Sequence, residues 1–209
     1  MKPPIPDRAA DPVGDAPLVN LPNALTLLRV LCVPILALLL WLDDGQLGWA
    51  RDAAAVLFVL ASITDLIDGA IARRYGLVTT FGKVADPIAD KALTGVALIG
   101  LSLLGDLSWW VTGIILVREI GVTLLRFWVI EHGVIPASRG GKLKTVGQTV
   151  AIARYLADVP LPWWSTASAI VMAAAVVLTV VTGLDYVVRA VRLRRQPPET
   201  TSTLGVHRG

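Results

Sequence analysis

Four aspartates, Asp65, Asp68, Asp86 and Asp90, stand at the ends of two consecutive apolar segments, spaced so that they could act together. Asp65 and Asp68 are three residues apart, and Asp86 and Asp90 are four apart, so each pair shares one face of a helix. A turn of about fifteen residues between the two helices would let these faces meet. Four carboxylates brought together repel one another unless cations lie between them. The pattern therefore predicts a metal site.

The chemical type of the ligands restricts which metal ion could bind. A set of oxygen ligands without His or Cys favours Mg²⁺ or Mn²⁺ over zinc. Two such ions could bind a pyrophosphate and neutralise the charge that builds on a departing phosphate. The alternative is that the aspartates simply pair with nearby basic residues, namely Arg73, Arg74, Lys83 and Lys91. Such pairing explains a single carboxylate better than four at paired spacings, so we expect two divalent ions.

The composition indicates the kind of element that positions these residues. Hydrophobic residues make up 55% of the 209 positions and charged residues 17%, which is too apolar for a soluble domain of this length. Six apolar segments have about the length that a helix needs to cross a bilayer: 24–42, 50–69, 85–105, 109–131, 145–161 and 165–189. Pro87 suits a first helical turn and favours a third helix that begins near Asp86. We predict an all-α membrane protein with six transmembrane helices over residues 20–192, between disordered ends at 1–19 and 193–209.

The orientation follows from the distribution of basic and aromatic residues. Basic residues gather in the second and fourth connections and at the C-terminus: Arg73, Arg74, Lys83, Arg139, Lys142, Lys144, Arg189, Arg192, Arg194 and Arg195. Tryptophans gather at the other connections: Trp41, Trp49, Trp109, Trp110, Trp163 and Trp164. Since positive charge marks the cytoplasmic side and tryptophan favours the interface, both termini and the aspartates are predicted to face the cytoplasm.

The aspartates belong to a longer run that resembles the signature of the CDP-alcohol phosphotransferase family. The pattern D-x2-D-G-x2-A-R-x8-G-x3-D-x3-D is matched at Asp65, Asp68, Gly69, Ala72, Arg73, Gly82, Asp86 and Asp90. The resemblance implies a cytoplasm-facing cavity with two metal ions, in which a hydroxyl attacks the β-phosphate of a CDP-linked alcohol and CMP departs. It makes Asp65, Asp68 and Asp86 metal ligands, and Asp90 the general base, also near a metal.

The same resemblance assigns a site for the nucleotide. Gly69, Arg73 and Thr79 would contact the CDP moiety, while Ala72 and Gly82 would let it approach the backbone. Small residues also serve helix packing in membranes, and Arg73 also obeys the charge rule for cytoplasmic loops. Both explanations stay open for these positions.

Further stretches resemble the phosphatidylglycerophosphate synthase branch of the family: Leu21–Arg29, Phe81–Lys91, Arg118–Ile120, Pro136–Ser138 and Gly141–Thr145. In that branch CDP-diacylglycerol donates a phosphatidyl group to the 1-hydroxyl of sn-glycerol 3-phosphate. The resemblance therefore implies these two substrates, a lipid environment in a bacterial inner membrane, a homodimer and no nucleic-acid partner. One departure is Arg139, because the branch commonly has Trp after Pro-Ala-Ser.

An acceptor that carries its own phosphate needs a cationic pocket. The candidates are Arg118, Lys142, Lys144 and Arg29, with Thr26 or Thr145 adding a hydroxyl. Arg118 lies within an apolar segment, where an unpaired cation is costly. The alternatives are that the lysines contact lipid headgroups and that Arg118 pairs with Glu119. Arg126 and Glu131 better fit a structural pair.

Two further functions stay open. The acceptor could instead be inositol phosphate, serine or phosphatidylglycerol. The aspartates could also line a path for divalent cations, as carboxylates in membranes often do. Against a path, no polar residues continue across the second or third segment to the far side.

Overall fold

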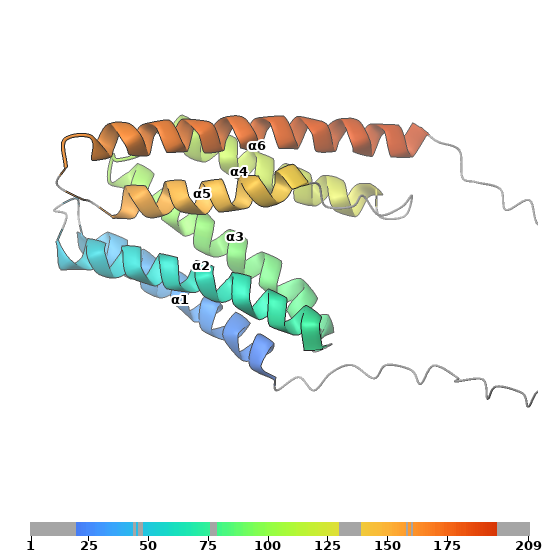
Figure 1. The fold of residues 1–209 in the computed structure, drawn as a ribbon, viewed down its shortest axis with the longest axis horizontal. Helices are drawn as coiled ribbons and strands as arrows, with labels where there is room; N and C mark the ends of the chain where they lie inside the picture. The colour runs from blue at the N-terminus through green and yellow to red at the C-terminus, as the bar shows by residue number, and fades with distance from the viewer. Residues whose placement is uncertain are drawn as a thin grey trace, which may run out of the picture. The chain divides into compact units, whose positions relative to one another are not determined.

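The computed structural model describes residues 20–43, 45, 48–75, 79–129, 139–157, 159 and 161–195. Every regular element in these ranges is a helix, and they form α1 (Leu21–Asp43), α2 (Trp49–Tyr75), α3 (Thr80–Leu103), α4 (Trp109–Val129), α5 (Arg139–Leu156) and α6 (Trp164–Arg195) (Figure 1). The prediction of an all-α chain with six helices is confirmed for this part of the sequence. The predicted lead-in at 1–19 and most of the predicted tail lie outside the described residues.

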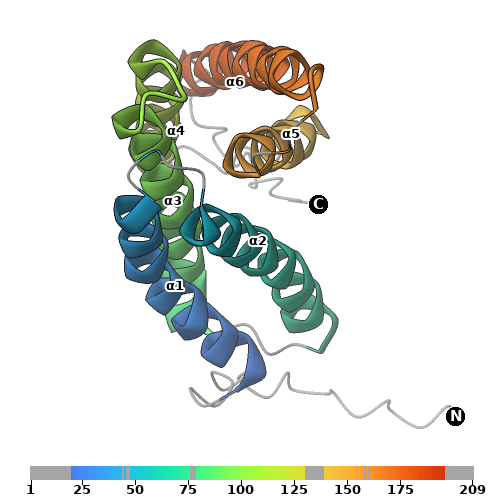
Figure 2. The same cartoon turned by 90° about the vertical axis from the view of Figure 1, so that its left-hand side faces the viewer.

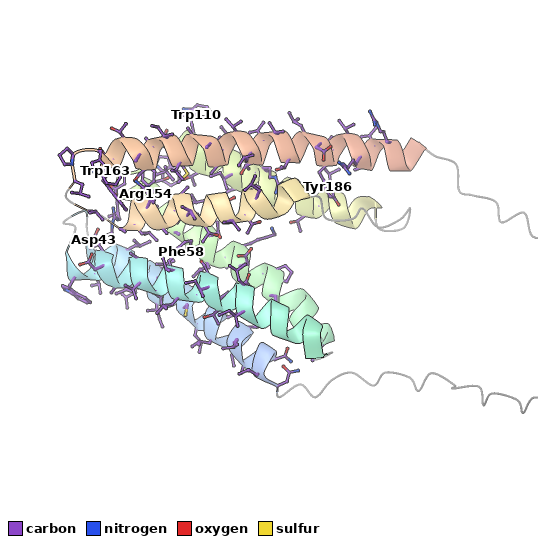
Figure 3. The ribbon with its side chains drawn as sticks, viewed as in Figure 1. Asp43, Phe58, Trp110, Arg154, Trp163 and Tyr186 are labelled. Carbon is purple, nitrogen blue, oxygen red and sulfur yellow. The ribbon has the colours of Figure 1, made fainter. Side chains whose placement is uncertain are left out.

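The chain divides into two compact units, one up to Gly100 and one from Leu101. The first unit contains α1, α2 and most of α3. In it α1 and α2 lie side by side and run in opposite directions (Figure 2). Their connection is fixed by Asp43, which accepts a hydrogen bond from the Gly48 N–H at 3.2 Å and pairs with Arg51 at 3.5 Å. Asp43 lies at the end of α1 in Figure 3.

Two helix boundaries in the first unit differ from the prediction. α2 continues to Tyr75, and α3 begins at Thr80 rather than near Asp86. The early start of α3 has a local cause, because the Thr79 hydroxyl caps it by accepting a hydrogen bond from the Gly82 N–H at 2.9 Å. Pro87 therefore lies inside the helix and not in its first turn. The predicted turn of about fifteen residues is wrong, since only residues 76–79 separate the two helices.

The second unit contains the end of α3 and the helices α4, α5 and α6, with α6 packed against both α4 and α5. α3 ends at Leu103 and is followed by Gly105 in a left-handed conformation (φ 82°), where the Asp106 N–H donates a hydrogen bond to the Leu101 carbonyl. α5 begins at Arg139, six residues before its predicted start. Lys142 and Lys144 thus lie on a helix, and the prediction that they stand on a turn is wrong.

Within the described part of the chain, two helices are long and apolar enough to cross a membrane, over Asn23–Asp43 and Trp164–Arg192. Most of each is not buried within the chain. Five of the tryptophans beside the connections are also exposed, namely Trp41, Trp49, Trp109, Trp110 and Trp163. Trp110, which Figure 3 labels, is 83% exposed. Apolar surface of this kind favours a lipid environment. Six spans and cytoplasmic termini stay predictions.

Candidate active site

One face of α1 carries the polar residues that meet the acidic motif. Asn23, Thr26 and Arg29 follow one another at intervals of three and are all buried, with exposed fractions of 7%, 1% and 2%. We call these three residues the α1 polar stripe. Polar side chains buried on an otherwise apolar helix need partners, and each member of the stripe has one on α2, on α3 or just before α3.

Two members of the stripe contact predicted metal ligands. Arg29 Nη1 lies 2.8 Å from Asp65 Oδ1, and the Thr26 hydroxyl donates a hydrogen bond to Asp86 Oδ1. Arg29 is almost fully buried, whereas the Asp65 side chain is one-third exposed. Both Thr26 and Arg29 were predicted to bind the acceptor's phosphate. The structure places them against the aspartates, and the predicted role in acceptor binding stays a prediction.

The third member of the stripe supports the start of α3. Asn23 Oδ1 accepts a hydrogen bond of 2.8 Å from the Thr79 hydroxyl, which in turn caps Gly82. Thr79 is 1% exposed. The predicted contact between Thr79 and the CDP moiety stays a prediction, and the structure adds a capping role for this hydroxyl.

Gly82 occupies a crowded position. A Cβ added there would lie 3.1 Å from Asn23 Oδ1 and 3.2 Å from Thr79 Oγ1, both tighter than ordinary contacts. Asp86 Oδ2 would be 3.8 Å away. Three oxygen atoms therefore surround this glycine, one of them from a predicted metal ligand.

The structure describes the side chains of some of the remaining motif residues but not of others. Asp68, Gly69, Ala72 and Arg73 lie on α2, but their side chains are outside the described part. Asp90 lies on α3 one turn after Asp86 and is partly buried. Among the side chains that the structure does describe, no three His, Cys, Asp or Glu residues lie close enough to hold a metal ion.

The donor chemistry of this site still fits a hard divalent cation. Asp65, Asp86 and Asp90 offer only carboxylate oxygens, and the atoms around Gly82 are oxygens as well. Mg²⁺ binds through one or two carboxylates together with substrate phosphates and water, so it needs no closed protein cage. The first unit therefore provides ligands of the type that a metal-dependent phosphate reaction uses.

The second unit holds a separate cluster of charged residues. Arg118 on α4 bonds Glu119 Oε1 at 3.1 Å, the Thr182 hydroxyl at 3.0 Å and the Thr179 carbonyl at 3.2 Å. Lys144 on α5 pairs with the same Glu119 oxygen. The pairing of Arg118 with Glu119, left open by the sequence, is therefore present. Arg118 and Lys144 thus both pair with the same carboxylate oxygen.

The other predicted acceptor residues lie on α5. Thr145 is exposed, and the side chain of Lys142 is outside the described part, as is that of Arg126 on α4. Glu131 is outside the described residues altogether, so the predicted pair of Arg126 and Glu131 stays a prediction.

Sequence reasoning missed several polar residues. Asn23 and Gln148 were given no role, although both are buried. The sequence could have indicated them, because a polar residue at helical spacing from other polar residues in an apolar segment is uncommon. Arg154, also without a role, lies with its guanidinium 4.0 Å from the ring of Trp164, and the Trp164 indole N–H donates to the Ala157 carbonyl at 2.8 Å. This contact joins the end of α5, where Figure 3 labels Arg154, to the start of α6.

Comparison with known proteins agrees with this arrangement. The sequence model of the CDP-alcohol phosphatidyltransferase family matches residues 19–181. A Mycobacterium tuberculosis protein named "Probable phosphatidylglycerophosphate synthase" is 55% identical over 179 residues, covering 86% of this chain and 85% of that protein.

More distant relatives bear a related name. Proteins of Rickettsia typhi and Escherichia coli K12, both named "CDP-diacylglycerol--glycerol-3-phosphate 3-phosphatidyltransferase", are 40% and 38% identical. Each alignment covers 80% of this chain, with 94% of the first protein and 92% of the second. Members of the matched family generally use a divalent metal. The family match spans most of the chain and includes the acidic motif, and the chain therefore belongs to the CDP-alcohol phosphatidyltransferase family.

Proposed function

We propose that this protein transfers a phosphatidyl group from CDP-diacylglycerol to sn-glycerol 3-phosphate, giving phosphatidylglycerophosphate and CMP. The observation that carries the reaction class is the acidic motif of α2 and α3, whose Asp65 and Asp86 are held by the α1 polar stripe. The choice of acceptor is supported by the names of relatives that align with most of the chain.

The chemistry is an in-line displacement at phosphorus. The 1-hydroxyl oxygen of the acceptor forms a bond to the β-phosphorus of the donor, while the bond from that phosphorus to the bridging oxygen breaks and CMP leaves. Asp90 accepts the hydroxyl proton as general base. Arg73, Gly69, Ala72, Thr79 and Gly82 bind the CDP moiety in this proposal.

The charge of the reacting phosphates requires compensation. Asp65, Asp68, Asp86 and Asp90 would hold Mg²⁺ or Mn²⁺, two ions in all, and divalent cations supply charge neutralisation for a phosphate leaving group. The α1 polar stripe keeps Asp65 and Asp86 in place, because a buried arginine and a buried hydroxyl fix the two carboxylates from one side.

The cations of the second unit suit the acceptor's phosphate. Arg118 and Lys144 come together at Glu119, and paired cations of this kind bind phosphate through charge-assisted hydrogen bonds. Lys142 and Thr145 follow on the first turns of α5. We assign these residues of the second unit to the acceptor's phosphate.

The protein works within a membrane in this proposal. We propose six transmembrane helices in the bacterial inner membrane, both termini and the active site on the cytoplasmic side, and a homodimer. The exposed apolar residues of α1 and α6 and the exposed tryptophans beside the connections support a lipid environment.

The test is CMP release by the purified protein with CDP-diacylglycerol and Mg²⁺. Glycerol 3-phosphate is compared with inositol phosphate, serine and phosphatidylglycerol. We expect release with glycerol 3-phosphate alone. Release only with a different acceptor would overturn the acceptor assignment while leaving the reaction class intact.

The general base has a test of its own. Asp90→Asn removes the proton acceptor but keeps the side chain's size, so turnover should fall by about 100-fold or more. Binding of CDP-diacylglycerol, measured by titration, should change little. Near-normal CMP release from this variant would show that Asp90 is not the base.

A further inference from the structure

We infer that Gln148, together with Thr179, recognises a free hydroxyl group of the acceptor and thereby helps to select which phosphorylated alcohol reacts. This inference rests on the proposed function and deepens it. It concerns residues of the second unit only, in which Gln148 lies on α5 and Thr179 on α6.

Gln148 is a buried polar residue with an unused acceptor. Its side chain is 4% exposed, and its Oε1 atom has no hydrogen-bond partner among the described residues. Buried amide oxygens are nearly always hydrogen-bonded, because leaving one unpaired forfeits its hydration without replacement. An amide oxygen accepts hydrogen bonds, so the missing partner is a donor such as a hydroxyl.

Thr179 presents a second unused atom on the helix that packs against α5. A Cβ added at Gly147, next to Gln148, would lie 3.9 Å from Leu178, which precedes Thr179. Thr179 is fully buried, and its Oγ1 also has no hydrogen-bond partner in the described part of the chain. Two adjoining helices thus carry buried polar atoms without partners.

The charged cluster shares helix α5 with Gln148 and contacts the backbone of Thr179. Lys144 precedes Gln148 by one helical turn and therefore shares its face of α5. On α6, the Thr179 carbonyl accepts a hydrogen bond from Arg118 Nε. A ligand with a phosphate at one end and a hydroxyl a few atoms away would meet both the cations and Gln148. Small phosphorylated alcohols have this chemistry, and sn-glycerol 3-phosphate keeps its 2-hydroxyl free in the reaction.

The experiment compares two acceptors that differ only in that hydroxyl. 3-Hydroxypropyl phosphate keeps the attacking primary hydroxyl and the phosphate of glycerol 3-phosphate but lacks the 2-hydroxyl. CMP release is measured with each acceptor in the wild-type protein and in Gln148→Met, which is similar in size and cannot accept the bond. We expect the wild type to prefer glycerol 3-phosphate by at least about tenfold in kcat/KM, and the variant to lose this preference.

Further variants separate recognition from structural damage. Gln148→Glu retains an acceptor oxygen and should retain the preference, and Thr179→Val should weaken it. Ser168→Ala removes another buried hydroxyl of α6, bonded to the Trp164 carbonyl, and should leave the preference unchanged. An unchanged KM for CDP-diacylglycerol shows that each variant is folded.

Failure of this inference can be told apart from failure of the proposed function. If Gln148→Met lowers activity equally with both acceptors, or leaves the preference intact, the inference is wrong while the proposed function stands. If the wild type releases CMP with another acceptor and not with glycerol 3-phosphate, the proposed function fails and the inference fails with it.

Discussion

At the scale of single residues, the aspartates of the motif depend on partners from outside it. Arg29 meets Asp65 and the Thr26 hydroxyl meets Asp86, while Asn23 binds the threonine that caps α3. A carboxylate held by a second residue keeps one geometry, and preorganised groups are what phosphoryl chemistry requires. The α1 polar stripe is therefore as much a part of the candidate site as the motif itself.

At this scale we predict how a substitution at Gly82 changes stability and activity. Gly82→Ala would force a Cβ against Asn23 and Thr79, so we expect a loss of about 1–3 kcal/mol in stability together with reduced CMP release. Gly113→Ala is the matched control, because nothing lies within 4 Å of its Cβ position and alanine is the better helix former. Thermal unfolding in detergent compares the two variants. Equal effects would show that the crowding at Gly82 is unimportant.

At the scale of the elements, a buried ion pair lies at the connection of α1 and α2. Arg51 and Asp43 have side chains exposed by only 2% and 0%, and Asp43 also binds the Gly48 N–H. Removing one partner of such a pair leaves an uncompensated charge, whereas removing both avoids that cost.

We predict that replacing both partners restores much of the stability that is lost when Arg51 alone is replaced. Arg51→Met alone should lower the free energy of unfolding by about 3 kcal/mol, because Asp43 is left buried without its cation. Arg51→Met combined with Asp43→Asn should recover most of that loss. Chemical unfolding followed by tryptophan fluorescence measures both, and a double variant as unstable as the single one would contradict this account.

The helix boundaries at this scale follow from capping more than from hydropathy. α3 begins five residues earlier than the apolar segment because Thr79 caps it, and α5 begins at Arg139 in a stretch rich in glycine and lysine. The apolar segments indicated which stretches are helical, but hydropathy does not detect the polar first turns. As a result Lys142, Lys144 and Thr145 lie on a helix with a defined face.

At the scale of the whole molecule, the exposed apolar surface and the exposed tryptophans fit a protein surrounded by lipid. The proposed orientation gives a prediction. In a Cys32→Ala background, which removes the single cysteine, Ser165→Cys at the exposed start of α6 should react with a membrane-impermeant maleimide on intact cells. Ser202→Cys in the C-terminal tail should react only after permeabilisation. The reverse pattern would invert the proposed topology.

The sequence by itself determined the reaction class and the number of helices. Eight motif residues at fixed spacings identify the chemistry, and apolar segments of membrane length reveal helices because hydrophobic surface must be buried or face lipid. Helical periodicity also predicts that Asp65 shares a face with Asp68, and Asp86 with Asp90.

Only the tertiary structure decided which residues meet. Arg29 and Asp65 are 36 positions apart, and Thr26 and Asp86 are 60 apart. Periodicity gives the face of one helix but not the face of the neighbour that it contacts, because that choice depends on how side chains interdigitate. The same holds for Gln148 and Thr179, whose unused polar atoms become visible only once α5 and α6 are packed together.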